Sequence, residues 1–229
     1  MCERYSFALP KDKTARRYGV KVPFPLEAHY NISPGTLAPV IRDGSANVLS
    51  RAEWGTAGPP GKNGKPGKLV VARPLGPLLG TEAGDAVLSR RCLVPADGFY
   101  AWRQVNKRSR VPYRVTLKWN LPFAFAGVWA EEGEEGGEKK VTFSVLTAAA
   151  NELLLPFGTQ MPLLLPLDEE KSWLGDGADL HRLAGLSFPA GQMKMFSVSP
   201  QLNRKELNSP ALIEPVQATD QFGNYMLFE

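Results

Sequence analysis

RRCLVPADGFYAW, residues 90–102, is the segment from which the fold of this chain is most readily inferred. The apolar run Cys92–Pro95 predicts a buried strand, and Ala96-Asp97-Gly98 predicts a tight turn before two aromatic residues. We expect Gly98 to supply the backbone freedom of the turn and Pro95 to end the strand ladder. The segment therefore indicates a buried strand followed by a bend in an α+β domain.

The flanking sequence alternates between short apolar runs and turn signals. It predicts one α+β domain over residues 1–229, with mixed, mostly antiparallel sheets forming the core and a few peripheral helices. The basic segment 56–68 is expected to be a flexible loop, and the acidic segment 131–140 a hairpin loop. The apolar pattern resumes directly after the basic segment, at 69–71. The expected strands are 37–41, 47–54, 113–119 paired with 123–130, 141–146 and 194–198, and the expected helices are 11–17, 81–89, 147–155 and 168–174.

Composition excludes several classes of protein. The chain has 229 residues and a net charge of +4, and no apolar segment reaches the roughly 18 residues of a membrane span. Its basic N-terminal region lacks the apolar core of a signal peptide, which predicts a cytoplasmic protein. Two cysteines and two histidines at no ligand spacing predict neither a disulfide nor a metal site. Phosphate-binding glycine and nucleophilic serine motifs are missing as well, so we expect no cofactor.

Cys2 is the chemically distinctive residue. Once Met1 is removed, it presents an amine with a reference pKa of about 8 beside a thiol of about 8.5, so both nucleophilic forms are accessible near neutral pH. Such an aminothiol forms a Schiff base with an aldehyde, and its sulfur then closes a thiazolidine ring. It can also serve as an amidohydrolase nucleophile that uses its own amine as the base. A cysteine that follows methionine by chance is the plain alternative.

Taken together, segments along nearly the whole chain resemble the SOS-response-associated peptidase family of abasic-site-processing proteins. Residues 90–102 carry the central motif, and the others occur in the expected order and spacing. They are Met1-Cys2-x-Arg4, Asn31-Ile32-Ser33-Pro34, Pro39-Val40, Trp54-Gly55, Ala72-Arg73, Pro112-Tyr113, 125–129, 143–147, Ala150-Asn151, Met161-Pro162, Val198-Ser199 with Asn203, and 212–216.

The resemblance implies a barrel-like core around a positively charged cleft with Cys2 at its centre. Family members bind single-stranded or junction DNA and capture the aldehyde of an abasic site as a Cys2 thiazolidine, with associated lyase and self-processing peptidase activities. By the same resemblance, the phosphates would be bound by Arg4 and Arg73, and the bases would meet Pro34 and Trp54. It further implies a cytoplasmic monomer that joins the nucleoid during DNA damage.

Three positions depart from the family pattern. Ala101 stands where the family has glutamate, Val71 where it has asparagine and Gly158 where it has histidine. None of the three side chains can transfer a proton, which typically contributes 10²–10⁴-fold to a rate. We therefore expect DNA binding with weakened or lost covalent chemistry. The alternatives are a fully active crosslinking enzyme, a cysteine peptidase with an N-terminal nucleophile, and a scaffold that binds a protein.

Overall fold

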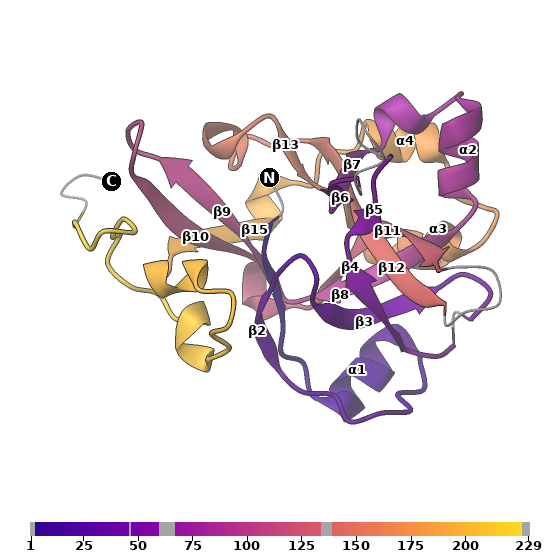
Figure 1. Cartoon of the computed structure of the whole chain (residues 1–229), viewed down its shortest axis with the longest axis horizontal. Helices are drawn as coiled ribbons and strands as arrows, with labels where there is room; N and C mark the ends of the chain where they lie inside the picture. The colour runs from indigo at the N-terminus through magenta and orange to yellow at the C-terminus, as the bar shows by residue number, and fades with distance from the viewer. Residues whose placement is uncertain (1–2, 46, 60–66, 134–138, 226–229) are drawn as a thin grey trace.

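A closed five-stranded barrel forms the core of the computed structural model, which describes residues 3–45, 47–59, 67–133 and 139–225 (Figure 1). Around the barrel each strand pairs with the next, and the parallel pair β4–β12 joins antiparallel neighbours. Aromatic and branched side chains such as Phe125, Phe143 and Val145 fill it. The barrel strands are β3 (Leu37–Arg42), β4 (Ser50–Trp54), β12 (Lys140–Ala149), β11 (Phe123–Glu132) and β8 (Arg91–Ala96).

A second, five-stranded sheet stands beside the barrel. Its order is β15 (Met193–Ser197), β10 (Arg110–Leu117), β9 (Gly98–Gln104), β1 (Tyr5–Phe7) and β2 (His29–Ile32). A bend at Asp97 carries the chain from β8 of the barrel directly into β9 of this sheet. The segment 90–102 thus joins the two sheets, which confirms the expected α+β architecture and barrel-like core.

Short elements cover the outside of the two sheets (Figure 1). No helix in the described ranges is long and apolar enough to cross a membrane. The helices are α1 (Lys11–Tyr18), α2 (Glu82–Leu88), α3 (Glu170–Leu174) and α4 (Leu180–Ala184). The remaining strands are β5 (Thr56–Ala57), β6 (Leu69–Val70), β7 (Ala72–Pro74), β13 (Gln160–Pro162) and β14 (Leu164–Leu165). The 3₁₀ turns are η2 (Gly76–Leu78), η3 (Lys118–Asn120), η4 (Leu155–Phe157), η5 (Leu167–Glu169), η6 (Ala190–Gln192), η7 (Pro200–Asn203) and η8 (Pro210–Ile213).

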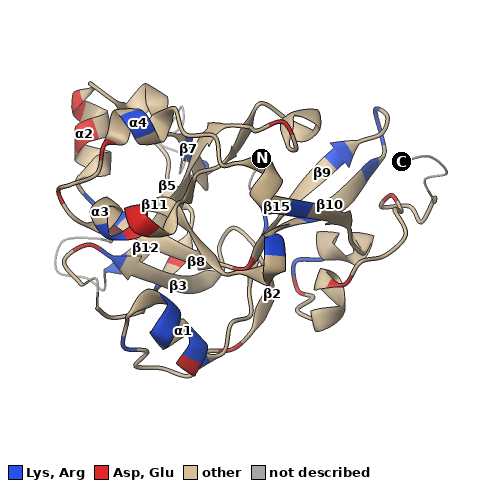
Figure 2. Ribbon diagram, turned by 180° about the vertical axis from the view of Figure 1, so that it is seen from behind, with Lys and Arg blue, Asp and Glu red and all other residues tan. Residues whose placement is uncertain are grey.

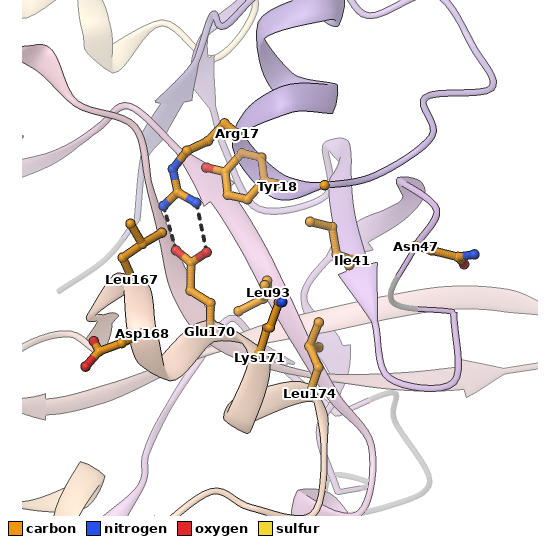
Figure 3. A pocket seen from close by; sticks show the side chains of 11 residues that line it. Arg17, Tyr18, Ile41, Asn47, Leu93, Leu167, Asp168, Glu170, Lys171 and Leu174 are labelled. Atoms are coloured by element: carbon orange, nitrogen blue, oxygen red, sulfur yellow. Dashed lines mark hydrogen bonds and ion pairs between the residues drawn. The ribbon is translucent and has the colours of Figure 1, made fainter.

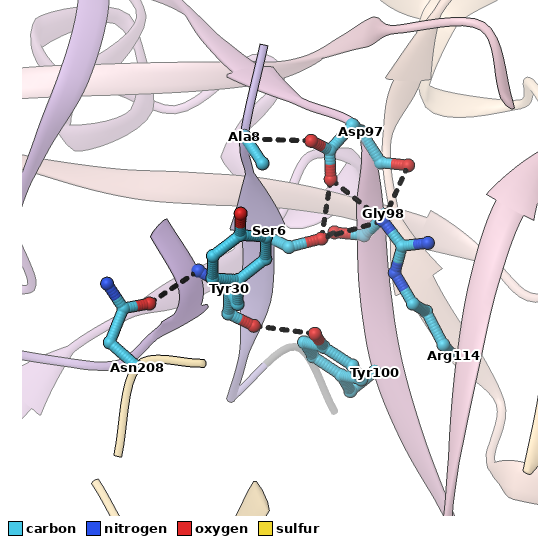
Figure 4. Close-up of polar contacts among 8 residues, drawn as sticks. All are labelled: Ser6, Ala8, Tyr30, Asp97, Gly98, Tyr100, Arg114 and Asn208. Carbon is cyan, nitrogen blue, oxygen red and sulfur yellow. Dashed lines mark hydrogen bonds and ion pairs between the residues drawn. The ribbon is translucent and has the colours of Figure 1, made fainter. Parts of the chain in front are cut away.

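Asp97 is a polar hub at the junction of the sheets (Figure 4). Its carboxylate accepts hydrogen bonds from Ser6 Oγ at 2.6 Å, from the backbone N–H of Ala8 at 2.6 Å and from Arg114 Nη2 at 2.9 Å. The reason for Gly98 differs from the predicted one. A Cβ there would lie 2.7 Å from Arg114 Nε, so the glycine is needed for the close approach of the guanidinium. Hence the motif ties β1 and β10 to the bend.

Pro95 does not end the ladder as expected. It lies inside β8, paired with Ala124 of β11, beyond the point at which β8 leaves β3 at Leu93. Its missing N–H is tolerated because that side of the strand is no longer paired with β3.

One predicted strand pair and one predicted helix are wrong, and two predicted segments have other bounds in the structure. Strand β10 pairs with β9 and β15 and not with β11, because the segment 118–122 passes from one sheet to the other. The helix expected over 147–155 is absent, since β12 continues to Ala149 and pairs there with β13. The strand expected over 47–54 begins at Ser50. The start of segment 56–68 pairs, as β5, with the residues that directly follow the segment, as β6. Residues 60–66 of this segment, and 134–138 of the acidic loop, lie outside the described residues.

Candidate functional site

Strand β1 brings the N-terminal end of the described chain between β2 and β9. Tyr5 pairs with Ile32 on one side and Phe99 on the other, and the N–H of Tyr100 donates to the carbonyl of Arg4 at 3.1 Å. Cys2, the predicted nucleophile, lies outside the described residues. The antiparallel register places Arg4 beside Tyr100, the residue that precedes Ala101 in β9.

Arg4 is a buried cation without a carboxylate partner in the described part of the chain. The residue is 7% exposed, Nη1 is buried without a hydrogen-bond partner, and Nη2 reaches only the carbonyl of Asn203, at 3.5 Å. Burial lowers the pKa of its guanidinium from the ordinary value. A buried charge is costly unless it is paired, so Arg4 is poised to meet an anion.

Arg73 resembles Arg4 in having a buried N–H donor without a partner. It lies on β7, which pairs in parallel with β12, and its Nη2 donates to Thr56 Oγ1 at 3.0 Å. Nε is buried without a partner, and burial lowers the pKa of the guanidinium. The Thr56 hydroxyl lies 2.9 Å from that of Ser144, so a short polar chain holds the arginine in place.

Two other arginines of low exposure form ion pairs within the described chain. Arg17 makes two hydrogen bonds to the Glu170 carboxylate, at 2.9 and 2.7 Å, beside a cavity of 680 Å³ between α1 and α3 (Figure 3). Arg114 pairs with Asp97 at 2.9 Å (Figure 4). Arg42 has a buried Nε without a partner and no ion pair, as Arg73 does, but its guanidinium lies over the Trp129 ring, 4.6 Å from the centroid.

Trp54 is part of the core. It is fully buried, its ring stacks on Phe143 and meets the edge of Tyr5 with ring centroids 5.1 Å apart, and Nε1 donates to the carbonyl of Val71 at 2.9 Å. No face of the indole is open to a base, so the predicted DNA contact at Trp54 is replaced by a packing role beneath the site.

Pro34 occupies a more accessible position, at the tip of the turn between β2 and β3. Gly35 follows it with φ at 85°, and the turn is held to the barrel because the Gly35 N–H donates to the Trp54 carbonyl at 2.8 Å. Pro34 is partly exposed there. It therefore stays available as a contact residue.

The three positions that were expected to depart from the family pattern each have a structural role. Ala101 is 2% exposed and lies opposite Tyr113 in the β9–β10 ladder. The carbonyl of Val71 accepts from Trp54 Nε1 and from the Val145 N–H. Gly158 ends η4 with φ 148° and ψ 170°, a conformation that only glycine adopts readily. These three positions supply no acid or base.

Asn31 is a positioning residue whose role the sequence does not reveal. Its side-chain amide donates to the carbonyls of Leu202, Arg204 and Leu207 at 3.3, 2.9 and 3.0 Å. It thereby fixes the segment that presents Asn203 to Arg4. In the sequence, Asn31 and Asn203 both belong to segments that match the family. That match does not reveal that the Asn31 side chain binds the backbone around Asn203, which is distant in the chain.

Cys92, the other cysteine of the sequence, is fully buried. Burial in the barrel raises the pKa of the Cys92 thiol far above its usual range, so it stays protonated and unreactive. Within the described ranges, no group of three His, Cys, Asp or Glu side chains could hold a metal ion.

The fold and site thus define an α+β protein with a barrel core and two arginines poised for an anion. The chain belongs to the SOS response associated peptidase (SRAP) family, whose model matches residues 1–205. Abasic site processing protein YoqW of Bacillus subtilis is 32% identical over 93% of this chain and 99% of its own length, and YoaM of the same organism is 29% identical over 93% and 98%. A solved protein from Bacteroides thetaiotaomicron shares the fold, with a TM-score of 0.80, 20% identity and coverage of 94% of this chain and 100% of its own.

Proposed function

We propose that this protein binds single-stranded DNA through Arg4 and Arg73, and that its covalent capture of abasic sites is weakened or lost. The observation that carries the proposal is the pair of arginines with buried, unpartnered N–H donors and no ion pair in the described chain. Burial lowers the pKa of both guanidinium groups, and for Arg4 the charges of Glu3 and Glu206 oppose that lowering. Phosphate oxygens are the ligands that such guanidinium groups accept best. The names of the relatives support DNA with abasic sites as the substrate class.

The proposed weakening of the chemistry follows from Ala101, Val71 and Gly158. By the resemblance, the family's glutamate, asparagine and histidine at these positions transfer protons during Schiff-base formation and ring closure. A Cys2 aminothiol would retain its intrinsic reactivity without them, but would lack general acid–base assistance worth about 10²–10⁴-fold. The loss at position 158 goes beyond a missing imidazole, because a histidine at φ 148° would be strained.

Salt-dependent binding tests the first part of the proposal. The affinity for a single-stranded oligonucleotide is measured by fluorescence anisotropy at several salt concentrations for the wild type, Arg4→Met, Arg73→Met and the surface control Lys11→Gln. Each arginine variant is expected to bind at least about tenfold more weakly and to lower the logarithmic salt slope by about 0.7, the value for one phosphate of a single strand. Wild-type affinity in both variants would refute the assigned phosphate contacts.

The alternatives make different predictions in the same system. A fully active enzyme would form a Cys2-dependent covalent band with an abasic oligonucleotide on a denaturing gel at the rate of its relatives. A scaffold that binds protein would show no salt-dependent affinity for DNA. A peptidase would cleave peptide substrates in trans, and Cys2→Ala would abolish the cleavage.

A further inference from the structure

A basic arm projects from the second sheet, and nothing in the site described above uses it. The arm is the β9–β10 hairpin, and Figure 2 shows basic residues along it. Its segment 103–110 holds four cationic residues and no acidic one. All four are exposed, and none forms an ion pair with a carboxylate in the described part of the chain. They are Arg103, Lys107, Arg108 and Arg110.

Aromatic rings lie among these cations. The Arg110 guanidinium stands over the Trp102 ring, 5.3 Å from its centroid, and Trp102 Nε1 is a buried donor without a partner. Phe222 and Tyr225, which are 66% and 64% exposed, belong to the C-terminal segment that docks on the hairpin. Because both rings are mostly exposed, packing within the chain does not explain why large aromatic residues stand at these positions.

Hydrogen bonds attach the C-terminal segment to the arm. The Arg110 N–H donates to Gln221 Oε1 at 2.9 Å, and Gln221 Nε2 donates to the carbonyl of Arg108. Asp220 in turn accepts from the N–H groups of Phe222 and Asn224, both at 2.9 Å. The two exposed rings are therefore held on a short structured loop beside the cations. This loop lies beyond residue 205, where the family match ends.

The arm is continuous with the Arg4 end of the site. Arg4 lies beside Tyr100, where β9 begins its run toward the hairpin tip, and the strand from Tyr100 to Gln104 adds roughly 13 Å at 3.3 Å per residue. Arg110 is near enough to Arg4 to contribute to the lowering of its pKa, after the larger effect of burial. A basic track thus runs from the site outward along the hairpin.

We infer that the β9–β10 hairpin and residues 219–225 form a second binding surface, which holds the single-stranded DNA that flanks the site. Unpaired bases stack on exposed aromatic rings whatever their sequence, while nearby cations bind the phosphates between them. This combination favours a single strand over an acidic protein, which would use the cations but offer no bases to the rings. The inference rests on the proposed function, because the arm extends the same DNA site.

The test compares two deoxythymidine oligonucleotides, of about five and about fifteen nucleotides, which bracket the usual site sizes for single strands. Anisotropy titrations over a salt series are made with R103Q/K107Q/R108Q, with F222A/Y225A, and with the control K11Q/K13Q/K21Q. The control removes three exposed lysines on and after α1, on another part of the surface (Figure 1). Thermal unfolding checks that all three variants fold.

The wild type is expected to bind the longer oligonucleotide at least about tenfold more tightly than the shorter one. The triple hairpin variant is expected to lose that advantage and about 2 units of the logarithmic salt slope, and the double aromatic variant to lose about tenfold in affinity with little change in slope. Equal affinity of both hairpin-region variants and the control for the longer strand would overturn the inference while leaving the proposed function intact. Failure of the wild type to bind either oligonucleotide would refute the proposed function and the inference with it.

Discussion

Replacement of Arg4 by methionine should separate stability from DNA binding, and Arg114 provides a matched comparison. The two arginines are equally buried, each 7% exposed, so their packing environments restrict solvent to the same degree. They differ in partners, because Arg114 forms an ion pair with Asp97 at 2.9 Å, whereas Arg4 forms none in the described residues and Glu3 and Glu206 act on it without a direct contact. Methionine keeps most of the aliphatic volume and removes the charge in both cases.

The expected magnitudes follow from that difference. Removal of one member of a buried ion pair costs about 3–5 kcal/mol, so Arg114→Met should lose about 3 kcal/mol or more of unfolding free energy. Removal of a buried charge that has no ion pair breaks no such interaction. Arg4→Met should therefore leave the free energy of unfolding unchanged or raise it by about 1 kcal/mol. For a chain of this size, about 3 kcal/mol corresponds to a melting temperature about 6–12 °C lower.

Urea and thermal unfolding of the DNA-free proteins, followed by tryptophan fluorescence, measure both effects, and anisotropy measures the affinity for DNA. We expect Arg4→Met to melt at or above the wild-type temperature and to bind DNA at least about tenfold more weakly. If Arg4→Met is destabilised as much as Arg114→Met, then Arg4 is a structural residue with an internal partner, and the reasoning that assigns it to a ligand fails.

Three further predictions concern the motif, the core and the C-terminal loop. Gly98→Ala places a Cβ 2.7 Å from Arg114 Nε, so equilibrium unfolding should show a loss of about 2 kcal/mol or more, while Gly177→Ala, in open space, should be nearly neutral. Trp54→Ala leaves a large cavity in the core and should cost about 3–5 kcal/mol by the same assay; a loss under about 1 kcal/mol would contradict its core role. Hydrogen bonds, first among them that from Asn224, lower the pKa of Asp220 to about 2, below its unfolded value of about 3.9. The ionised Asp220 therefore stabilises the loop fully above about pH 4, and this stabilisation disappears as the pH falls toward 2. Amide exchange of residues 221–225 measures it, and Asp220→Asn should abolish the pH dependence of their protection. The same pH dependence in Asp220→Asn and wild type would disprove the assigned role of Asp220.

The segment 90–102 shows how far sequence reasoning reaches. Its apolar run and turn signals are local, and they correctly predict the buried strand β8 and the bend at Asp97, whereas the strand β9 that follows was not predicted. The partners of those strands are set by contacts distant in the chain, such as Asp97 with Ser6, which no local pattern contains. The same limit explains why β10 and β11 were wrongly expected to form a hairpin, since the turn between them redirects the chain from one sheet to the other.

The helix prediction over 147–155 is wrong for a different reason. Alanine and leucine there give a helical propensity, but Thr147 and Ala148 belong to the long strand β12 and pair with β13, and tertiary pairing overrides local preference. The resemblance drew attention to Arg4 and Arg73 as candidate site residues, whereas their buried, unpartnered N–H donors could be recognised only from the structure. The burial of Trp54 was likewise invisible to spacing, because a tryptophan on a strand can face either the core or a ligand.

The rate of covalent capture tests the central claim most directly. Protein from which Met1 has been removed is mixed with a single-stranded abasic oligonucleotide beside YoqW, with Cys2→Ala as the control, and the covalent product is followed on denaturing gels. We expect wild-type protein to bind the oligonucleotide and to form the product at least about 100-fold more slowly than YoqW, since Ala101, Val71 and Gly158 supply no acid or base. A Cys2-dependent product formed at the rate of YoqW would contradict the account.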